Sequence, residues 1–379
     1  MCFGDISSGV GGINRSTNCY DRESFVRKGP RKQGSREGRS NCGLIDLVEG
    51  IREIAKRLMT PGKGIFAADA TTKSITARLE GYGIATDDES RRKYRELLFT
   101  TPGMGEYISG VIMNDESIRQ TDNNGKKFTE ILMNGGLAVG IKVDKGTVDV
   151  PNFPGEKVAL GLDGLKERLV EYAQMGAVFT KWRSVITIGD KIPTREIVSL
   201  NAWGLAQYAA MVQGAGMVPI VEPEVVMAGN HEAEKCAQAT ELTARLVFDA
   251  LADLRVDFEG MIYKVNMVLP GKDCDKEISD EEAARMTVET LGKVIPVDCA
   301  GVVFLSGGQD PIAATRRLNM IVKHDETVWP MSFSFERALE NKVMETWKGN
   351  DENWQKAQET LVHRAKLNSL AVQGKYEGE

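Results

Sequence analysis

The sequence predicts a single (β/α)8 TIM barrel with extra helices at its two ends. Short apolar segments alternate with longer segments in which apolar residues recur at helical spacing, and no large domain is inserted between them. With 379 residues, of which 42% are hydrophobic and 27% charged, the chain is long enough to bury one large core. Length alone leaves two domains open, and the alternation favours one barrel.

Eight segments have the apolar, β-branched composition typical of buried strands. They span residues 64–69, 108–114, 137–144, 177–186, 217–225, 260–268, 301–308 and 327–335. Helical spacing is expected between them, over residues 87–98, 163–174, 195–213, 232–252, 280–293 and 312–323. A further amphipathic helix is predicted over residues 43–59, and the Pro-Gly-Lys-Gly turn at 61–64 closes it.

Residues 1–42 differ from the barrel domain predicted over residues 43–379. They are rich in Gly, Ser and Arg, have no apolar periodicity and carry a net charge of about +4, which leaves about −10 on the rest. We interpret them as a flexible basic tail of a cytoplasmic protein. The alternative is a transit peptide for a plastid or mitochondrion, although four acidic residues and the lack of a clear amphipathic helix argue against it.

Composition also argues against several classes of protein. No apolar run approaches the roughly 18 residues that cross a bilayer, so no membrane partner is expected. The six cysteines form no CxxC pair and the three histidines are widely spaced, which argues against a zinc site or a disulfide framework. The acidic body argues against a specific nucleic-acid partner. We expect reduced thiols, no metal and no cofactor.

One predicted strand, residues 260–268, contains a single charged side chain, Lys264. A buried ammonium must be paired, neutralised or chemically used, because removing it from water costs several kcal/mol or more. A neutral lysine amine can attack a carbonyl carbon and form a Schiff base. Lys264 is therefore a candidate nucleophile, and the alternative is a strand-end lysine that reaches solvent.

Other polar residues lie late in the predicted strands, where the active site of such a barrel is found. They are Asp69, Lys142, Lys181, Arg183, Glu222, Glu224, Ser306, Gly307, Gly308, Ser334 and Arg337. Their convergence on one mouth predicts an active site, and the excess of cations suits a phosphorylated substrate. The backbone N–H groups of Ser-Gly-Gly are a candidate phosphate site. Mutual repulsion among Lys142, Lys181 and Lys264 is expected to lower their amine pKa.

Seven stretches carry a resemblance to a known family over about Gly43 to Tyr376. They are GKGIFAAD, GLAVGIKVDKG, FTKWR, VPIVEPE, YKVNMVLPGKDC, VFLSGGQ and SFSFERAL. Together they resemble the class I fructose-bisphosphate aldolases. The resemblance implies reversible cleavage of fructose 1,6-bisphosphate to dihydroxyacetone phosphate and glyceraldehyde 3-phosphate in glycolysis and gluconeogenesis, without metal, in a homotetramer. Whether fructose 1-phosphate is also a substrate stays open.

The resemblance also implies roles for individual residues. Lys264 would form the Schiff base, Glu222 would act as general acid and base, and Asp69 would act on the C4 hydroxyl, with Lys181 and Glu224 assisting. One phosphate would be held by Ser306, Gly307, Gly308, Arg337 and Arg78, and the other by Lys142, Arg183 and Ser74. Ser334 is counted with the residues that bind substrate.

The sequence departs from the family pattern at several positions. Ala70 replaces an acidic residue, Val265 replaces a proline that follows the lysine, and Glu336 replaces a glycine whose N–H helps to bind phosphate. A Glu336 carboxylate turned inward would weaken phosphate binding, whereas one turned outward would cost only backbone freedom. Many members of the family carry a longer C-terminal arm that ends in a tyrosine, which helps proton exchange at C3 of the enamine, whereas this sequence stops soon after Tyr376. We therefore expect either that another group moves this proton or that turnover after cleavage is slow.

Two other functions are therefore kept as alternatives. One is a non-catalytic or weakly active binding protein on an aldolase scaffold, which the changes at Ala70 and Glu336 make plausible. The other is a different Schiff-base barrel enzyme, such as a deoxyribose-phosphate aldolase or a transaldolase, which shares the lysine chemistry.

Overall fold

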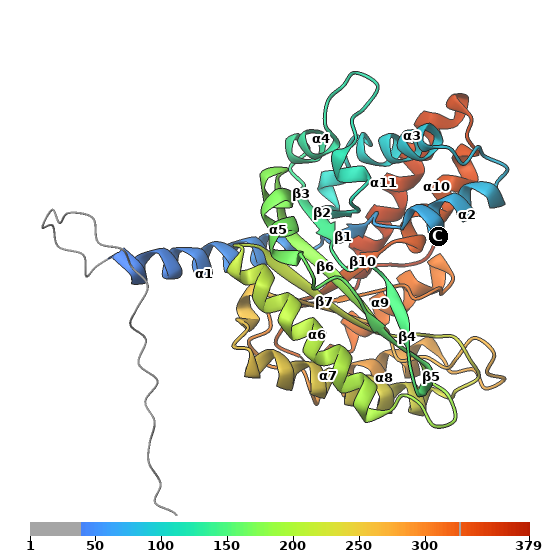
Figure 1. Cartoon of the computed structure of the whole chain (residues 1–379). Coiled ribbons are helices and arrows are strands. Elements are labelled where there is room, and N and C mark those ends of the chain that lie inside the picture. Colours follow the sequence, from blue (N-terminus) through green and yellow to red (C-terminus); the bar gives the residue numbers. More distant parts are fainter. Residues whose placement is uncertain (1–38, 326) are drawn as a thin grey trace, which may run out of the picture.

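The computed structural model describes residues 39–325 and 327–379, and these form a closed barrel of parallel strands (Figure 1). The barrel strands are β1 (Gly64–Ala67), β2 (Ile108–Met113), β3 (Ala138–Lys142), β6 (Ala177–Ile186), β7 (Val218–Val225), β8 (Ile262–Val265), β9 (Gly301–Phe304) and β10 (Met331–Phe335). Their order around the barrel is β1-β10-β9-β8-β7-β6-β3-β2. The predicted fold class is confirmed, and each barrel strand lies within a predicted segment.

Helices surround the strands. They are α1 (Arg39–Leu58), α2 (Thr72–Gly81), α3 (Asp88–Phe99), α4 (Phe128–Asn134), α5 (Leu165–Gln174), α6 (Arg195–Gly214), α7 (Ala233–Asp253), α8 (Asp280–Gly292), α9 (Pro311–Lys323), α10 (Arg337–Trp347) and α11 (Trp354–Ala371). Short 3₁₀ helices occur at Met104–Glu106, Ser117–Arg119, Phe258–Gly260 and Asp351–Asn353. Within residues 39–325 and 327–379, no helix is both long and apolar enough to cross a membrane.

Side-chain caps fix the start of several helices. Thr71, Asp87, Thr194 and Ser279 each accept a hydrogen bond from the backbone N–H three residues later, which satisfies one donor that the first turn leaves free. Asp310 caps α9 in the same way and is followed by a proline at the first helical position. The start of each of these five helices is therefore specified by the local sequence.

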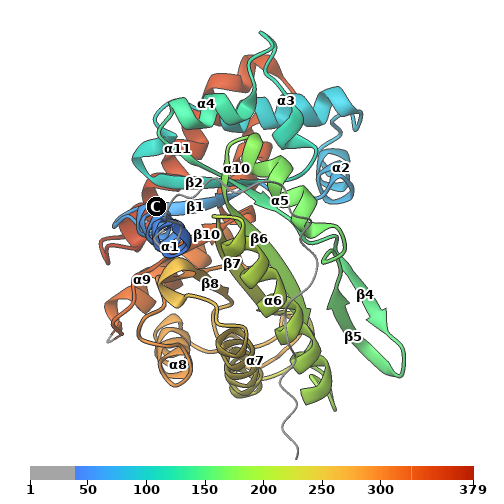
Figure 2. The ribbon, with the colours of Figure 1, turned by 60° about the vertical axis from the view of Figure 1, so that its left-hand side comes forward.

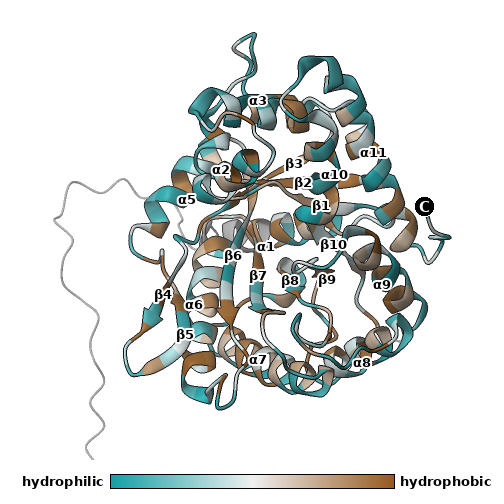
Figure 3. Cartoon of the chain, turned by 90° about the vertical axis from the view of Figure 1, so that its right-hand side faces the viewer, coloured by the Kyte–Doolittle hydropathy of each residue, from teal (hydrophilic) through white to brown (hydrophobic). Residues whose placement is uncertain are grey.

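Helix α1 closes the end of the barrel opposite the strand carboxyl ends. Its Ile51 and Leu58 pack in one buried cluster with inward-facing strand residues such as Phe179, Ile220 and Ile262. Figure 3 views the molecule from the side opposite α1, which lies behind the strands. This layer of the interior is mainly apolar, so the charged residues of the barrel strands are confined to the other end.

The structure also contains elements that the sequence pattern did not indicate. Strands β4 (Thr147–Val150) and β5 (Phe153–Ala159) form an antiparallel hairpin that projects from the barrel (Figure 2). The bounds of α2, α4, α10 and α11 were not predicted, although extra helices were expected at the C-terminal end. Helix α1 begins at Arg39, before the expected start at residue 43. Residues 1–38 of the predicted tail lie outside the described residues.

Candidate active site

A pocket of about 590 Å³ opens at the carboxyl ends of the barrel strands. Every site residue predicted from the sequence lines it except Gly308, which lies at the rim beside Arg337. Ala70, Thr71, Ala77, Leu305 and Glu336 complete the wall together with Ala67. The strands therefore bring these residues to one mouth, as the alternation of their sequence implied.

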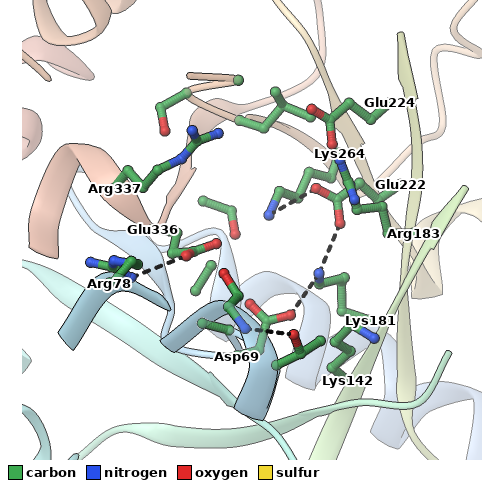
Figure 4. A pocket seen from close by; sticks show the side chains of 18 of the residues that line it. Asp69, Arg78, Lys142, Lys181, Arg183, Glu222, Glu224, Lys264, Glu336 and Arg337 are labelled. Carbon is green, nitrogen blue, oxygen red and sulfur yellow. Dashed lines mark hydrogen bonds and ion pairs between the residues drawn. The ribbon is translucent and has the colours of Figure 1, made fainter. Parts of the chain in front are cut away.

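Four charged side chains form a continuous chain at the base of the pocket (Figure 4). The Lys264 Nζ lies 3.1 Å from Glu222 Oε1, and the Lys181 Nζ lies 3.1 Å from Glu222 Oε2. Lys181 also lies 2.6 Å from Asp69 Oδ2. Each of the four residues is at most 4% exposed, so these ion pairs are shielded from solvent screening.

The electrostatics of this chain follow from its pairing. Burial alone would raise the pKa of Glu222, but Lys181 and then Lys264 outweigh burial and hold that pKa at about 2. Glu222 is therefore a carboxylate at neutral pH. Burial alone would lower the pKa of Lys181, but Asp69 and Glu222 outweigh it and raise this pKa.

The expected lowering of the pKa by mutual repulsion of the lysines is thus wrong for Lys181. Lys142 and Lys181 do lie side by side on β3 and β6. Their ammonium groups diverge, however, and Lys142 Nζ contacts Asp144 instead, at 2.5 Å from Oδ1 and 2.9 Å from the carbonyl oxygen. Asp144 was missed from the sequence, although its spacing of two residues from Lys142 is typical of a shared strand face.

Arg183 and Glu224 form a further ion pair on the same side of the pocket. Both side chains lie on the faces of β6 and β7 that Lys181 and Glu222 occupy, as the period of two along a strand predicted. The cation expected to bind phosphate is therefore already held by a carboxylate. A substrate anion must compete for it.

Arg78 is held between two glutamates on the opposite side of the pocket. Its Nη1 lies 3.3 Å from Glu336 Oε1, as Figure 4 shows. The same atom lies 2.8 Å from Glu340 Oε2. Burial raises the pKa of Glu340 to about 7 against the opposing effect of Arg78, and Tyr94 donates to this carboxylate at 3.2 Å. Glu336, whose orientation the sequence left open, points into the pocket. Glu340 was missed, because nothing in its helix pattern marks it as a partner of Arg78.

The turn after β9 and the end of β10 provide neutral polar groups. The Gln309 N–H donates to Ser306 at 2.9 Å, which closes a turn over Gly307 and Gly308. Both glycines have positive φ, at 52° and 82°, which other residues adopt at a cost. Ser334 Oγ is buried in the wall and has no hydrogen-bond partner in the described part of the chain, so a ligand oxygen could satisfy it.

Two further residues considered in the sequence can also be located. Val265 lies within β8, so the extended geometry expected for it is confirmed. Tyr376 does not line the pocket. It is buried, its N–H donates to Asn319 at 3.0 Å and its hydroxyl lies 3.5 Å from Glu379. Within residues 39–325 and 327–379, no group of three or more His, Cys, Asp or Glu side chains is arranged to hold a metal ion.

This fold and site define a class of protein: a (β/α)8-barrel enzyme that presents a buried lysine, paired with an ionised glutamate, to an anionic substrate. The sequence model of one family, described as fructose-bisphosphate aldolase class-I, matches residues 50–379. The chain belongs to the class I fructose-bisphosphate aldolase family.

Relatives and a solved structure agree with this assignment. The chain is 46% identical over 332 residues to a probable class 1 fructose-bisphosphate aldolase of Xanthomonas campestris, covering 87% of this chain and 99% of that protein. It is 45% identical to the fructose-bisphosphate aldolase of Dictyostelium discoideum, covering 86% and 92%. The structure of Plasmodium falciparum aldolase in complex with TRAP and a small-molecule inhibitor matches with a TM-score of 0.87, at 42% identity, covering 88% of this chain and 97% of that one.

Membership in the family establishes the reaction class. The protein is a lyase that cleaves fructose 1,6-bisphosphate reversibly in glycolysis, and the family resemblance expected from the seven sequence stretches is confirmed. The family acts on phosphorylated sugars, in agreement with the cationic mouth.

Proposed function

We propose that Lys264 is the residue that forms the Schiff base and that Glu222 is its general acid and base. The 3.1 Å separation of Lys264 Nζ from Glu222 Oε1 carries this proposal. The low pKa of Glu222 keeps its carboxylate ionised in the free protein, and its Oε1 lies close enough to the Lys264 Nζ to receive a proton from it as substrate binds. The neutral amine then attacks the C2 carbonyl carbon, and the proton that the nitrogen loses is transferred to the former carbonyl oxygen to give a neutral carbinolamine.

Loss of water from the carbinolamine uses the same pair of residues. Glu222 returns its proton to the departing hydroxyl, and the nitrogen lone pair forms the protonated imine. Lys181 lies 3.1 Å from the other Glu222 oxygen and holds this carboxylate in place throughout. Glu224, two residues along β7 and paired with Arg183, assists from the same face.

Asp69 is proposed as the base for carbon–carbon cleavage. It accepts the proton of the C4 hydroxyl, the C3–C4 bonding electrons move into the imine to give an enamine, and the aldehyde leaves. Lys181 supports this role, because its ammonium lies 2.6 Å from Asp69 and stabilises the carboxylate form. Lys181 thus positions both the base for cleavage and the acid for dehydration.

The two phosphates of the substrate are proposed to bind on opposite sides of the mouth. Ser306, Gly307, Gly308, Ser334 and Arg337 bind the one nearer the imine, and Arg78 joins them when it leaves its glutamates. Lys142, Arg183 and Ser74 bind the other. The unpartnered Ser334 hydroxyl supports the first site, and the exchangeable ion pairs of Lys142 and Arg183 support the second.

Borohydride trapping tests the central role of Lys264. The protein is mixed with dihydroxyacetone phosphate, with and without chelator, reduced, digested and mapped by mass spectrometry. A stable adduct on Lys264 that is indifferent to chelator is expected, and Lys264→Met must abolish it. An absence of adduct in folded wild-type protein contradicts the Schiff-base role and favours the alternative of a binding protein on an aldolase scaffold.

Assembly, location and domain boundaries are further proposals. We propose a homotetramer, testable by sedimentation equilibrium. We also propose a cytoplasmic location, or an organelle if residues 1–42 are a transit peptide before the barrel domain 43–379. The relatives support both locations, since they include a cytosolic aldolase of Arabidopsis thaliana and a chloroplastic one of Chlamydomonas reinhardtii. Sequencing the mature N-terminus of the native protein decides between them.

A further inference from the structure

Two cationic side chains converge on Gly308 at the rim of the pocket. Lys272 comes from the loop between β8 and α8, and Arg337 begins α10. A Cβ atom placed on Gly308 would lie 3.2 Å from Lys272 Nζ and 3.3 and 3.4 Å from the two terminal nitrogens of Arg337. Both cations therefore reach the same point above a backbone that carries no side chain.

These two cations differ from the other cations of the mouth in their partners. Lys264, Lys181, Lys142, Arg183 and Arg78 each form an ion pair with a carboxylate. Among the residues that the structure describes, neither Lys272 nor Arg337 lies within 4.0 Å of a carboxylate oxygen. Their charge is available to a ligand without displacing a protein carboxylate.

The position of Lys272 is fixed by its backbone. The N–H groups of Gly271, Lys272 and Asp273 donate to the carbonyl oxygens of His231, Met227 and Gly229 at 2.8, 2.8 and 2.9 Å. A Cβ on Gly271 would lie 2.1 Å from the Gly229 carbonyl oxygen, so only glycine permits this close contact between the two loops. The lysine side chain is exposed, but it starts from an anchored loop that directs it toward Gly308.

We propose that Lys272 is a phosphate-binding residue that acts with Arg337 and the Gly307–Gly308 backbone on the phosphate of the fragment attached to Lys264. This inference rests on the proposed function. The guanidinium of Arg337 offers a planar fork to two phosphate oxygens, Lys272 offers a point charge to a third, and Gly308 leaves room for the anion. Gly307, Arg337 and Lys264 line the same pocket, so one substrate can reach all three.

The test compares trapping with and without a phosphate on the ligand. Wild-type protein, Lys272→Gln and Lys272→Arg are incubated with dihydroxyacetone phosphate or with dihydroxyacetone and reduced with borohydride. Lys276→Gln is the matched control, since Lys276 is exposed on the same loop but pairs with Glu232 at 2.7 Å. All variants change exposed side chains, so folded protein is expected.

For Lys272→Gln we expect the concentration of dihydroxyacetone phosphate that gives half-maximal trapping to rise about three- to tenfold. Trapping by dihydroxyacetone stays unchanged, Lys272→Arg recovers most of the loss, and Lys276→Gln behaves as wild type. The inference is overturned if Lys272→Gln leaves the half-maximal concentration of dihydroxyacetone phosphate unchanged, or if it weakens trapping by both ligands equally. Neither result would contradict the Schiff base on Lys264. No adduct in the wild type overturns the proposed function and this inference with it.

Discussion

The two ends of the barrel interior are built from the same strands but differ completely in chemistry. On β6, Phe179 faces the apolar layer closed by α1, and Lys181, one step further along the same face, belongs to the ion-pair chain of the mouth. Ile262 and Lys264 show the same change on β8. The apolar layer stabilises the fold by burial alone. The charged layer must balance each desolvated charge with a partner, and in return it provides reactive groups.

Removing the proposed nucleophile, Lys264, is expected to have the largest effect, and to affect only the charged layer. Lys264→Met should lower kcat/KM for fructose 1,6-bisphosphate by about 10⁴-fold or more, since no other amine can form the imine. Glu222 keeps Lys181 as its partner, so the melting temperature should change little. A coupled cleavage assay and calorimetry measure both quantities, and substantial residual cleavage would contradict the role of Lys264.

The opposite result is expected for the apolar layer. Phe179 is fully buried, and its ring occupies the space where a Cβ on Gly140 would come within 2.3 Å. Phe179→Ala should lower the free energy of unfolding by about 3–5 kcal/mol because it leaves a cavity. Activity per folded molecule should stay within a few-fold of wild type. Urea denaturation and assays at low temperature separate these effects. A loss of activity without a loss of stability would contradict the view that the apolar layer serves stability and the charged layer serves the reaction.

Glu340 allows a test of the balance of charge against burial. Its folded-state pKa of about 7 lies above the ordinary value of 4.5, so the folded protein keeps a proton that the unfolded chain has lost between these pH values. Its contribution to stability therefore falls as pH rises through this window. Glu340→Gln should gain stability relative to wild type between about pH 5 and 7, by about 1–3 kcal/mol. Parallel pH profiles of the two proteins would show that the ion pair with Arg78 offsets burial fully.

The smallest expected effect concerns Glu336. Its carboxylate points into the pocket and occupies Arg78, so it should oppose a substrate phosphate at this end. Glu336→Gly should lower KM for fructose 1,6-bisphosphate by about two- to fivefold with little change in kcat, since the Arg78–Glu336 pair is long, at 3.3 Å, and partly exposed to solvent. Steady-state kinetics at low salt measure this difference. An unchanged KM would mean that Arg78 does not bind phosphate in this protein.

The barrel strands could be predicted from the sequence because each lies in a short, mainly apolar segment that alternates with segments of helical spacing. The hairpin β4–β5 could not, since it packs outside the barrel and most of its residues are partly or fully exposed. The bounds of helix α11 could not be predicted for a different reason, although extra C-terminal helices were expected. Arg364 and Asn368 are fully buried in α11 and form side-chain hydrogen bonds with Thr315. Because polar residues occupy these core positions, the apolar residues of α11 do not recur at clear helical spacing.

Most residues that line the pocket could be predicted because their position late in a strand is a local property of the sequence, whereas Ser74 and Arg78, on α2, were implied only by the family resemblance. Their pairing could not, because it depends on which carboxylate lies between which cations. Asp144 and Glu340 decide the electrostatics of Lys142 and Arg78, yet Glu340 lies 262 positions from Arg78 in the sequence. Repulsion among Lys142, Lys181 and Lys264 was expected, but in the structure each of these lysines forms an ion pair with a carboxylate.

The chain Asp69–Lys181–Glu222–Lys264 has a consequence for the covalent step. It contains two ammonium groups and two carboxylates, so it is neutral as a unit. A protonated imine carries the same single positive charge as the ammonium group that it replaces. The protein can therefore pass from free enzyme to covalent intermediate without importing a counter-ion or rearranging its interior, and the surroundings of the reacting carbon are already set before the sugar arrives.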